Sequence, residues 1–325
     1  MAGSEVTGRP DPAALTRDDA RLSDPEAAGE RGSSFRSGFV SFVGRPNVGK
    51  STLVNAIIGT KVSIVSDKVQ TTRTQVRGVL TLPDEAQIVF VDTPGILRPR
   101  TLLGERTNAA ATSALKGDVD VVIVMIDATM PLGKGDKWIS ARAPERSLLV
   151  VNKVDVASRS QVLEQLRRAG ELGFAEYFPV SAETGEGLDE LVDAIVARLP
   201  EGPMYYPLEM VRDVPETVWV AELVREQLLH VTNEELPHSI ACRVVEWEER
   251  DGKGPYVRIE ILVERESQKP IVIGKGGGVL KEVGSAVRAQ LPKGSYVELF
   301  VKVAKDWQRS DHLLDRLGYQ MPGHH

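Results

Sequence analysis

The pattern of apolar and polar positions changes its character twice along the chain. Residues 1–36 show no sustained periodicity and are rich in Pro, Gly, Ala, Asp and Ser, with no aromatic side chain before Phe35. Such a composition cannot bury enough apolar surface to order itself. We therefore predict a disordered N-terminal tail over 1–36, and a short C-terminal tail over 321–325.

Residues 37–200 alternate short apolar runs with helical stretches. The runs "GFVSFV", "QIVFVD", "DVVIVMID", "SLLVVNK" and "YFPVSA" are rich in Val and Ile. Such runs are typical of parallel strands buried on both faces, with helices between them. The run "TQVRGVLTL" predicts an antiparallel edge strand, and helices are expected after Gly49, before Asp120, after Asp155 and after Gly187. The pattern predicts an α/β domain whose mostly parallel sheet carries helices on both faces.

The composition and the hydrophobic pattern of the sequence change near residue 200. The stretch "LPEGPMYYPLEMVRDVPE" carries four prolines and no periodicity, so residues 201–216 are predicted to form a linker. Residues 217–320 then show the order helix, strand, strand, loop, helix, strand. This order predicts a second, α+β domain.

The amino-acid composition limits the classes of protein to which the chain can belong. The chain has 325 residues, of which 42% are hydrophobic and 26% charged, which is an ordinary globular balance with enough length for two domains. The single cysteine, Cys242, excludes an internal disulfide, and no apolar run approaches the roughly 20 residues that span a bilayer. We expect a cytoplasmic protein. Because the net charge is −6, any nucleic-acid site must be a local basic patch.

The stretch "VGRPNVGKST", Val43–Thr52, is the first candidate site. A glycine, four residues and then Gly-Lys-Ser follow an apolar strand and open a helix, which is the context that a phosphate-binding P-loop requires. Gly44 and Gly49 let backbone N–H groups converge on phosphate oxygens at the start of the helix. Lys50 would add a positive charge over the β- and γ-phosphates, and Ser51 would offer its hydroxyl oxygen to Mg²⁺.

Two further stretches complete the predicted magnesium site. "VFVDTPG" ends an apolar strand at Asp92, whose carboxylate would reach Mg²⁺ through water, and Gly95 can present its N–H to the γ-phosphate. The polar loop "SDKVQTTRTQ" lies between this strand and the P-loop. Such a loop would contribute a threonine to the metal shell only when the γ-phosphate is present. We choose Thr72 for this role, with Thr71 as the alternative.

Guanine selection is predicted from "NKVD" and "VSAET". The Asp155 carboxylate can accept hydrogen bonds from N1–H and the 2-amino group of guanine, a donor pair that adenine lacks. Asn152 would brace the loop and contact the base edge, and the Lys153 stem would pack across the ring. The Ala182 N–H would point towards O6.

The four motifs "GRPNVGKS", "DTPG", "NKVD" and "SAE" resemble the nucleotide-binding motifs of translation-factor-related GTPases. Where the Ras family places a glutamine to orient the attacking water, this sequence has Ile96, which can neither donate nor accept. We expect slow GTP hydrolysis, with an acceleration of about 10³ to 10⁵ left to a partner or a supplied cation.

Nucleotide binding is assigned to Gly44, Arg45, Pro46, Asn47, Val48, Gly49, Lys50, Ser51, Thr52, Asp92, Gly95, Asn152, Lys153, Asp155, Ser181, Ala182 and Glu183. Mg²⁺ binding is assigned to Ser51, Thr72 and Asp92, and catalysis to Asn47, Lys50, Thr72 and Gly95.

A second candidate site is the loop "PIVIGKGGGVLKEVG". A Rossmann dinucleotide loop would need glycine at position 279, which is valine, and no βαβ unit surrounds it. The stretch Gly274–Gly277 better resembles the GXXG loop of a KH domain, in which paired glycines let the backbone clamp four nucleotides while Lys275 meets a phosphate. The order of elements after residue 217 resembles the prokaryotic-type KH fold. Single-stranded RNA is therefore the predicted ligand.

Local charge agrees with this prediction. Between Ser267 and Arg309 the sequence has eight lysine or arginine residues and three acidic ones, a net charge of +5, while "EWEERDGKG" makes the opposite end acidic. The predicted RNA-binding residues are Ile273, Gly274, Lys275, Gly276, Gly277, Lys281 and Lys302.

Both halves together resemble the Era family of bacterial GTPases over residues 38–319, because a P-loop GTPase followed directly by a KH domain is a rare pairing. The resemblance implies Mg²⁺ and GTP or GDP as ligands, binding to the 3′ end of 16S ribosomal RNA and assistance in 30S ribosomal subunit biogenesis. It also implies a weak peripheral association with the membrane. The 36-residue tail and the weakly acidic second domain depart from the family's pattern. We expect a monomer.

Two other functions fit parts of the sequence. The chain could be an RNA-binding assembly scaffold with a vestigial nucleotide site, but Lys50, Ser51, Asp92 and Asp155 are all intact. It could also be a metabolic NTPase, but the sequence shows no further group of paired acids and no His/Cys cluster. A GTPase switch that binds RNA is the hypothesis that uses both motif sets.

Overall fold

The computed structural model describes residues 34–68, 71–96, 99, 101–116, 119–232 and 236–319. The tail predicted over 1–36 lies outside them except for its last three positions, and so does the tail predicted over 321–325. Arg36, the last residue of the predicted tail, is instead the first residue of strand β1, and its Nη1 donates to the Leu199 carbonyl oxygen at 2.6 Å. The described residues from Phe35 onward belong to one compact unit. The domain boundaries drawn from the sequence stay predictions.

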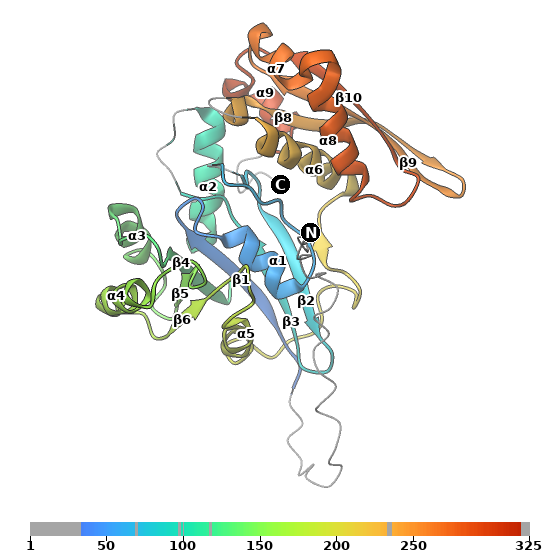
Figure 1. The fold of residues 1–325 in the computed structure, drawn as a ribbon. Helices are drawn as coiled ribbons and strands as arrows, with labels where there is room; N and C mark the ends of the chain where they lie inside the picture. The colour runs from blue at the N-terminus through green and yellow to red at the C-terminus, as the bar shows by residue number, and fades with distance from the viewer. Residues whose placement is uncertain are drawn as a thin grey trace, which may run out of the picture. The chain divides into compact units, whose positions relative to one another are not determined.

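A seven-stranded sheet with the order β6-β5-β4-β1-β3-β2-β7 forms the first half of the described chain (Figure 1). Its strands are β1 (Arg36–Gly44), β2 (Val76–Leu82), β3 (Ala86–Asp92), β4 (Val121–Asp127), β5 (Leu148–Asn152), β6 (Tyr177–Val180) and β7 (Arg212–Asp213). The strands from β6 to β3 are parallel neighbours, which confirms the five predicted runs. β2 is antiparallel to β3 as predicted. It is not the edge strand, because β7 pairs with its other side.

Helices cover both faces of this sheet because alternate strand residues point to opposite sides. In β4, Ile123 and Met125 join the apolar cluster that includes α1 and α5, whereas Val122 and Val124 join the cluster that includes α3 and α4. The helices are α1 (Lys50–Ile58), α2 (Leu102–Lys116), α3 (Lys134–Ser140), α4 (Arg159–Ala169) and α5 (Leu188–Val196). Helix α3 was not predicted, since seven residues are too few for a clear helical period.

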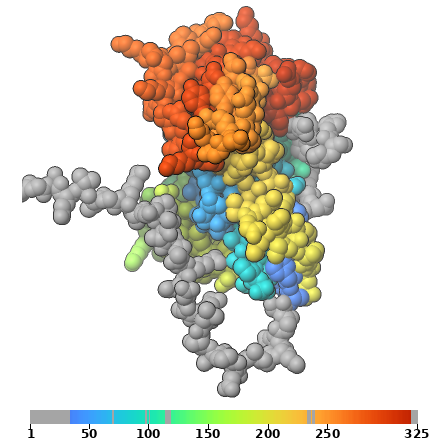
Figure 2. Space-filling model, turned by 90° about the vertical axis from the view of Figure 1, so that its right-hand side faces the viewer, coloured from blue at the N-terminus to red at the C-terminus, as the bar shows by residue number. Residues whose placement is uncertain are grey.

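The predicted linker over 201–216 runs along the sheet and becomes part of it. The Gln87 side-chain oxygen accepts hydrogen bonds from the backbone N–H groups of Tyr205 and Tyr206, at 2.7 and 2.9 Å. The Tyr205 ring stacks on Phe39, with 5.4 Å between the ring centroids. In Figure 2 the yellow surface of this segment lies beside the blue and cyan surface of the sheet. The linker therefore approaches the next element with its path fixed by hydrogen bonds.

The second half contains a three-stranded sheet with the order β10-β9-β8. Its elements are α6 (Glu216–Val231), β8 (Ala241–Arg250), β9 (Lys253–Val263), α7 (Lys269–Ile273), α8 (Gly278–Arg288), β10 (Tyr296–Val303) and α9 (Asp311–Arg316). The predicted order is confirmed, with two additions. Helix α7 lies within the predicted loop and α9 follows the last strand; both are too short to show a helical period. Within the described part of the chain, every helix is too short or too polar to span a lipid bilayer.

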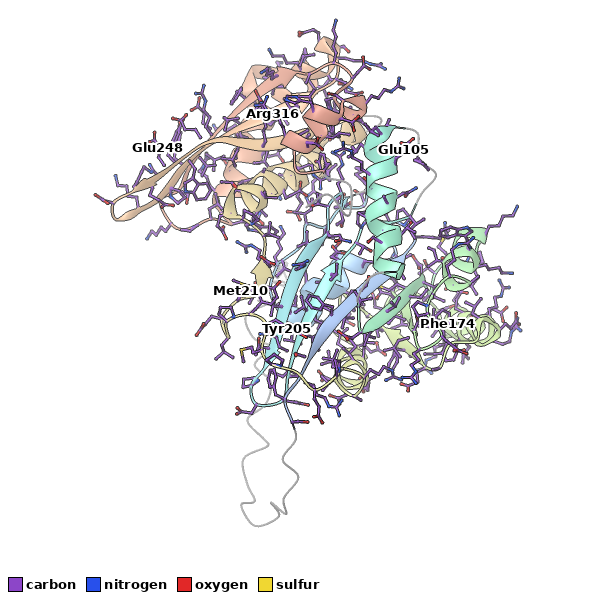
Figure 3. The ribbon with its side chains drawn as sticks, turned by 180° about the vertical axis from the view of Figure 1, so that it is seen from behind. Glu105, Phe174, Tyr205, Met210, Glu248 and Arg316 are labelled. Carbon is purple, nitrogen blue, oxygen red and sulfur yellow. The ribbon has the colours of Figure 1, made fainter. Side chains whose placement is uncertain are left out.

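Alternation in β9 decides which face of this sheet is covered. Val257, Ile259 and Ile261 pack against α6 and α8 in one apolar cluster, while Leu262 points to the other face. There it joins a smaller cluster with Leu103 of α2 and residues of α9. Figure 3 labels Glu105 in α2 and Arg316 in α9, on the two helices that meet at this point.

A buried arginine closes the contact between α2 and α9. Arg106 is 5% exposed, and its guanidinium donates to the carboxylates of Asp311 and Asp315, each at 2.5 Å. It also donates to the Tyr319 carbonyl oxygen at 2.6 Å. The two halves are thus joined both by apolar packing and by ion pairs whose cation is buried.

Candidate nucleotide and RNA sites

The P-loop lies where β1 meets α1. Gly44 is the last residue of β1 and Lys50 is the first of α1, so the loop between them spans the end of a buried strand and the start of a helix. Gly49 has φ of 98° and Asn47 has φ of 63°, both in the left-handed region. A Cβ on Gly49 would lie 2.2 Å from the side-chain nitrogen of Asn152. Only glycine fits this position.

Lys50 is buried, and it has no carboxylate partner among the described residues. Its Nζ donates to the carbonyl oxygens of Gly44 and Arg45, at 3.4 and 3.2 Å, and the residue is 6% exposed. Burial lowers the pKa of Lys50 to about 8, and the nearby charge of Asp92 opposes that shift. A desolvated ammonium whose hydrogen bonds within the described part of the chain go to carbonyl oxygens is suited to an anionic phosphate.

The three predicted magnesium ligands lie together. The Ser51 hydroxyl donates to Oδ2 of Asp92 at 2.7 Å and lies 2.9 Å from Oγ1 of Thr72. Thr72 Oγ1 also donates to Asp92 Oδ2, at 3.4 Å. The alternative, Thr71, instead donates to the Lys68 carbonyl oxygen at 2.8 Å. The geometry therefore favours Thr72 over Thr71.

Asp92 is fully buried, and its oxygens fit a hard cation. Burial raises its pKa, which the hydroxyl donors and Lys50 partly oppose. Oδ1 has no hydrogen-bond partner among the described residues. An orphaned carboxylate oxygen beside two hydroxyls is the oxygen-rich set that Mg²⁺ prefers when phosphates and water complete it.

Ser63 also contacts Asp92, and sequence reasoning missed it. Its hydroxyl donates to Asp92 Oδ2 at 2.7 Å, and the residue is 1% exposed. The Asn55 side chain fixes the Ser63 backbone, accepting from its N–H at 2.9 Å and donating to its carbonyl oxygen at 2.8 Å. The available signal was a lone serine between two apolar residues, Val62 and Ile64, both of which are buried.

Gly95 and Asn47 border the position predicted for the γ-phosphate. A Cβ on Gly95 would lie 2.8 Å from the Pro46 ring, so the "DTPG" turn and the P-loop touch here. Asn47 donates from its side chain to the Asp67 carbonyl oxygen at 2.7 Å, which links the P-loop to the loop that carries Thr72. Ile96 packs against the apolar cluster that includes α3 and α4.

The pieces predicted to bind guanine converge through Asn152. Its side-chain oxygen accepts from the Ala182 N–H at 3.0 Å, and the Ser181 hydroxyl donates to Oδ1 of Asp155 at 2.7 Å. These bonds join the end of β5 to the loop after β6. Glu183 is exposed in the same loop. The hydrogen bond from Ser181 therefore ties the Asp155 carboxylate to the loop after β6.

Lys153 has a partner that the sequence analysis did not name. Its Nζ donates to Oδ2 of Asp127, the last residue of β4, at 2.7 Å. Partial burial would raise the pKa of Asp127, but hydrogen bonds from Lys153 and Thr129 outweigh burial and lower it. A cavity of about 170 Å³ lies between these residues and the P-loop, including Arg45. The signal available in the sequence was an acidic residue at a strand end.

A smaller cavity, of about 50 Å³, lies on the phosphate side of the P-loop. Residues of the P-loop and of the loop around Thr72 form its walls. The predicted site residues that line it are Pro46, Asn47, Gly49, Lys50, Ser51, Thr52, Thr72 and Gly95. Sequence motifs that are distant along the chain thus share one hollow.

The predicted RNA loop connects α7 to α8. Gly274 has φ of 75°, and a Cβ there would lie 2.5 Å from the Val279 side chain. Gly276 and Gly277 also have positive φ, of 59° and 78°, but the space around them is open. Lys275 is exposed in the same loop. Gly274 is therefore required by packing, whereas the next two glycines leave a backbone surface that a ligand can approach.

Two other predicted RNA-binding residues flank this loop, and one does not. Ile273 is half-buried at the end of α7, and Lys281 is exposed in the first turn of α8. Lys302 lies elsewhere, because its neighbour Val301 packs towards the helices and Lys302 points to the opposite face of the sheet. There its Nζ lies 3.4 Å from the Glu260 carboxylate.

Comparison with protein families matches both halves. A family described as "50S ribosome-binding GTPase" matches residues 39–153, and a family described as "KH domain" matches residues 235–308. Among curated proteins, GTPase Era of Mycobacterium sp. (strain KMS) is 48% identical over 300 residues, which cover 88% of this chain and 100% of that protein. GTPase Era of Heliobacterium modesticaldum is 45% identical over 293 residues, covering 88% and 97% of the two chains.

Two solved structures are similar over most of the chain. One is a variant of Aquifex aeolicus Era bound to GDP.AlF4−, with a TM-score of 0.83 and 40% identity. The other is Era in complex with MgGDPNP and nucleotides 1506–1542 of 16S ribosomal RNA, with a TM-score of 0.83 and 39% identity. Each comparison covers 88% of this chain and 100% of the other.

Proposed function

This chain belongs to the GTPase Era family, and on that premise we propose that it is a GTP-binding and GTP-hydrolysing switch that binds the 3′ end of 16S ribosomal RNA. The observation that carries the proposal is the meeting of Ser51, Thr72 and Asp92, which come from three separate motifs. The proposal extends to assistance in 30S ribosomal subunit biogenesis.

Mg²⁺ and the phosphates would occupy the hollow above the P-loop. Ser51 and Thr72 would hold the ion through their hydroxyl oxygens, with Asp92 behind a water molecule, and Lys50 would meet the β- and γ-phosphates. The bound ion would neutralise negative charge on the phosphate oxygens. The relatives solved with MgGDPNP and with GDP.AlF4− support this assignment.

Guanine would be held between the ends of β5 and β6. Asp155 would accept from the base, while the hydrogen bond from Ser181 keeps its carboxylate oriented. Asn152 would brace the P-loop, and Lys153 would cover the ring with its head held by Asp127. A site built to pair with two guanine donors rejects adenine strongly, because its acceptors would be left unpaired.

Hydrolysis is proposed to be slow without a partner. Ile96 packs into an apolar cluster and offers no polar atom to a water molecule. Asn47 and the Gly95 N–H are the proposed polar groups on this side of the γ-phosphate, and Lys50 would stabilise charge on the phosphates. A cation or partner that completes such a site accelerates hydrolysis by about 10³ to 10⁵ in known GTPases.

RNA would bind at the loop between α7 and α8. The positive φ values and open surroundings of Gly276 and Gly277 let a nucleic-acid backbone approach closely. Lys275 and Lys281 would supply charge for the phosphates. The relative solved with a fragment of 16S ribosomal RNA supports the choice of ligand. Lys302 is not part of the site proposed at this loop, because it points to the opposite face of the sheet, where Glu260 offsets its charge.

The test is to measure GTP affinity and GTP hydrolysis with and without a short single-stranded RNA copied from the 3′ end of the organism's own 16S ribosomal RNA. A scrambled RNA of the same length is the control. We expect specific binding and a change in affinity or rate. RNA binding without any GTP binding would instead favour the scaffold function.

Cellular behaviour is proposed from the family and from the composition. We propose a cytoplasmic monomer with at most weak peripheral contact with the membrane. Sedimentation of the pure protein and fractionation of cells test the two statements separately. A dimer at micromolar concentration, or recovery mainly with membranes at moderate salt, would contradict them.

A further inference from the structure

Thr72 lies between two residues that are held by the second half of the chain. On one side, Nη2 of Arg225 in α6 donates a hydrogen bond to the Thr71 carbonyl oxygen. On the other side, Nη1 of Arg73 donates to the Ile240 carbonyl oxygen at 2.6 Å. The backbone that carries the Thr72 hydroxyl is therefore tied on both sides to elements that come much later in the sequence.

Arg225 is a fully buried guanidinium. Nε and Nη2 both donate to the Glu222 carboxylate, at 2.9 and 2.5 Å, and the side chain has no exposed surface. Burial would lower the pKa of Arg225, but the Glu222 carboxylate outweighs burial and raises it, so the group is charged. Among the described residues, Thr71 is the hydrogen-bond partner of Arg225 outside its own helix. Burying a charge of this kind costs free energy of folding, so we expect the buried Arg225 to serve a function.

Helix α6 also holds the beginning of the same loop. The Val65 N–H donates to Oε1 of Glu226 at 2.9 Å, and Nε2 of His230 lies 3.1 Å from the Val65 carbonyl oxygen. Ile64 belongs to the apolar cluster of the second half. Val65 and Thr71, which lie on the two sides of this loop, are thus both held by helix α6.

We propose that Arg225 is a positioning residue for the magnesium site: by holding the Thr71 carbonyl it fixes where the Thr72 hydroxyl lies relative to Ser51 and Asp92. This inference rests on the proposed function, in which Thr72 binds Mg²⁺ when GTP is present. The RNA-binding half then sets how tightly the GTP state holds its ion. By reciprocity of coupled equilibria, binding of Mg²⁺ and GTP biases the position of α6.

The plain alternative is that Arg225 only joins the two halves. The two roles differ in what they disturb, because a contact that merely joins the halves affects every nucleotide state alike. A residue that positions Thr72 affects only the state in which Thr72 is a ligand. Binding of GDP without Mg²⁺ does not involve Thr72, so it serves as the internal reference.

The experiment uses the full chain with Arg225→Met and Arg225→Lys. Affinity for a fluorescent, non-hydrolysable GTP analogue is titrated against Mg²⁺ concentration, and GDP affinity is measured in EDTA. We expect the Mg²⁺ concentration at half-maximal analogue binding to rise about 10- to 100-fold in Arg225→Met, as for losses of groups that orient a metal ligand. GDP affinity in EDTA should not change. Arg225→Lys keeps the charge and should show a smaller rise, and it carries the test if the methionine variant does not fold.

Lys61→Met is the matched control. It removes the ion pair between Lys61 and Glu226, which also joins the two halves, but it does not touch Thr71 or Thr72. Its Mg²⁺ dependence should equal that of the unmodified protein. Thr72→Ala is the reference for loss of the ligand, and Arg225→Met combined with Thr72→Ala should be no worse than Thr72→Ala alone.

The possible outcomes distinguish a failure of the inference about Arg225 from a failure of the proposed function. If Thr72→Ala weakens Mg²⁺-dependent binding while the Arg225 variants match the control, Arg225 is not a positioning residue and the proposed function stands. If the effects of the Arg225 and Thr72 changes simply add, the inference is also overturned. If Thr72→Ala has no effect, the proposed magnesium switch itself is wrong.

Discussion

The side-chain amide of Asn152 donates to the carbonyl oxygen of Val48 at 2.9 Å, while its side-chain oxygen accepts from the Ala182 N–H. One asparagine therefore holds the P-loop, the end of β5 and the loop after β6 in one arrangement. Because neutral hydrogen bonds are directional, this fixes the distance between the predicted phosphate and guanine sites before any nucleotide binds.

Asp155→Asn should change the base that the site prefers. The substitution replaces an acceptor oxygen with a donor, so one hydrogen bond to guanine is lost and xanthine, which has an oxygen at position 2, becomes a better partner. Loss of a charged hydrogen bond should weaken GTP binding by about 10- to 100-fold. Competition between GTP and XTP measures the exchange. Unaltered guanine preference would refute the assignment, and RNA binding should stay the same.

Ser63→Ala should weaken Mg²⁺-dependent nucleotide binding. The lost hydroxyl removes one of the hydrogen bonds that orient the Asp92 carboxylate, and losses of this type cost about 10- to 100-fold in metal affinity. Titration of GTP-analogue binding against Mg²⁺ is the measurement.

Ser41→Ala is the matched control for Ser63→Ala. Ser41 is also a buried serine of the first half, but its hydroxyl has no hydrogen-bond partner among the described residues. Equal behaviour of the two variants would show that Ser63 has no part in the magnesium site.

Nucleotide binding should weaken as pH rises through 8. Burial lowers the pKa of Lys50 to about 8 in the nucleotide-free protein, whereas bound phosphates favour its charged form. Above that pH a proton must be taken up for binding, so affinity should fall by up to about tenfold per pH unit. GDP binding in EDTA between pH 7 and 9 measures the slope. Lys50→Ala should bind weakly with no such slope; an equal slope in both proteins would contradict the prediction.

Gly276→Asp should weaken RNA binding by at least about tenfold, because it places a negative charge where phosphates are expected. Gly252→Asp is the matched control. Gly252 also has a positive φ, of 65°, with open space around it, but it lies in the β8–β9 hairpin. The two variants carry the same backbone strain and the same charge, so equal RNA affinity in both would count against the KH loop as the site.

The sequence by itself determined the elements whose cause is local. Five apolar runs identified the parallel strands, and the glycines around Lys50 identified the P-loop, since a phosphate cradle needs a flexible backbone at the start of a helix. The order of the four motifs along the chain also predicted a GTPase nucleotide site. Short helices such as α3, α7 and α9 were not predicted, because a helical period in the hydrophobic pattern needs more residues than they have.

The tertiary structure decided which groups meet. The choice of Thr72 over Thr71 depends on which side of the loop faces Asp92, and two adjacent threonines look alike in a sequence. The contacts of Ser63 with Asp92 and of Arg225 with Thr71 join residues that no periodicity or spacing connects. Local patterns record the preferences of a backbone segment, whereas such contacts arise only when distant segments pack against one another.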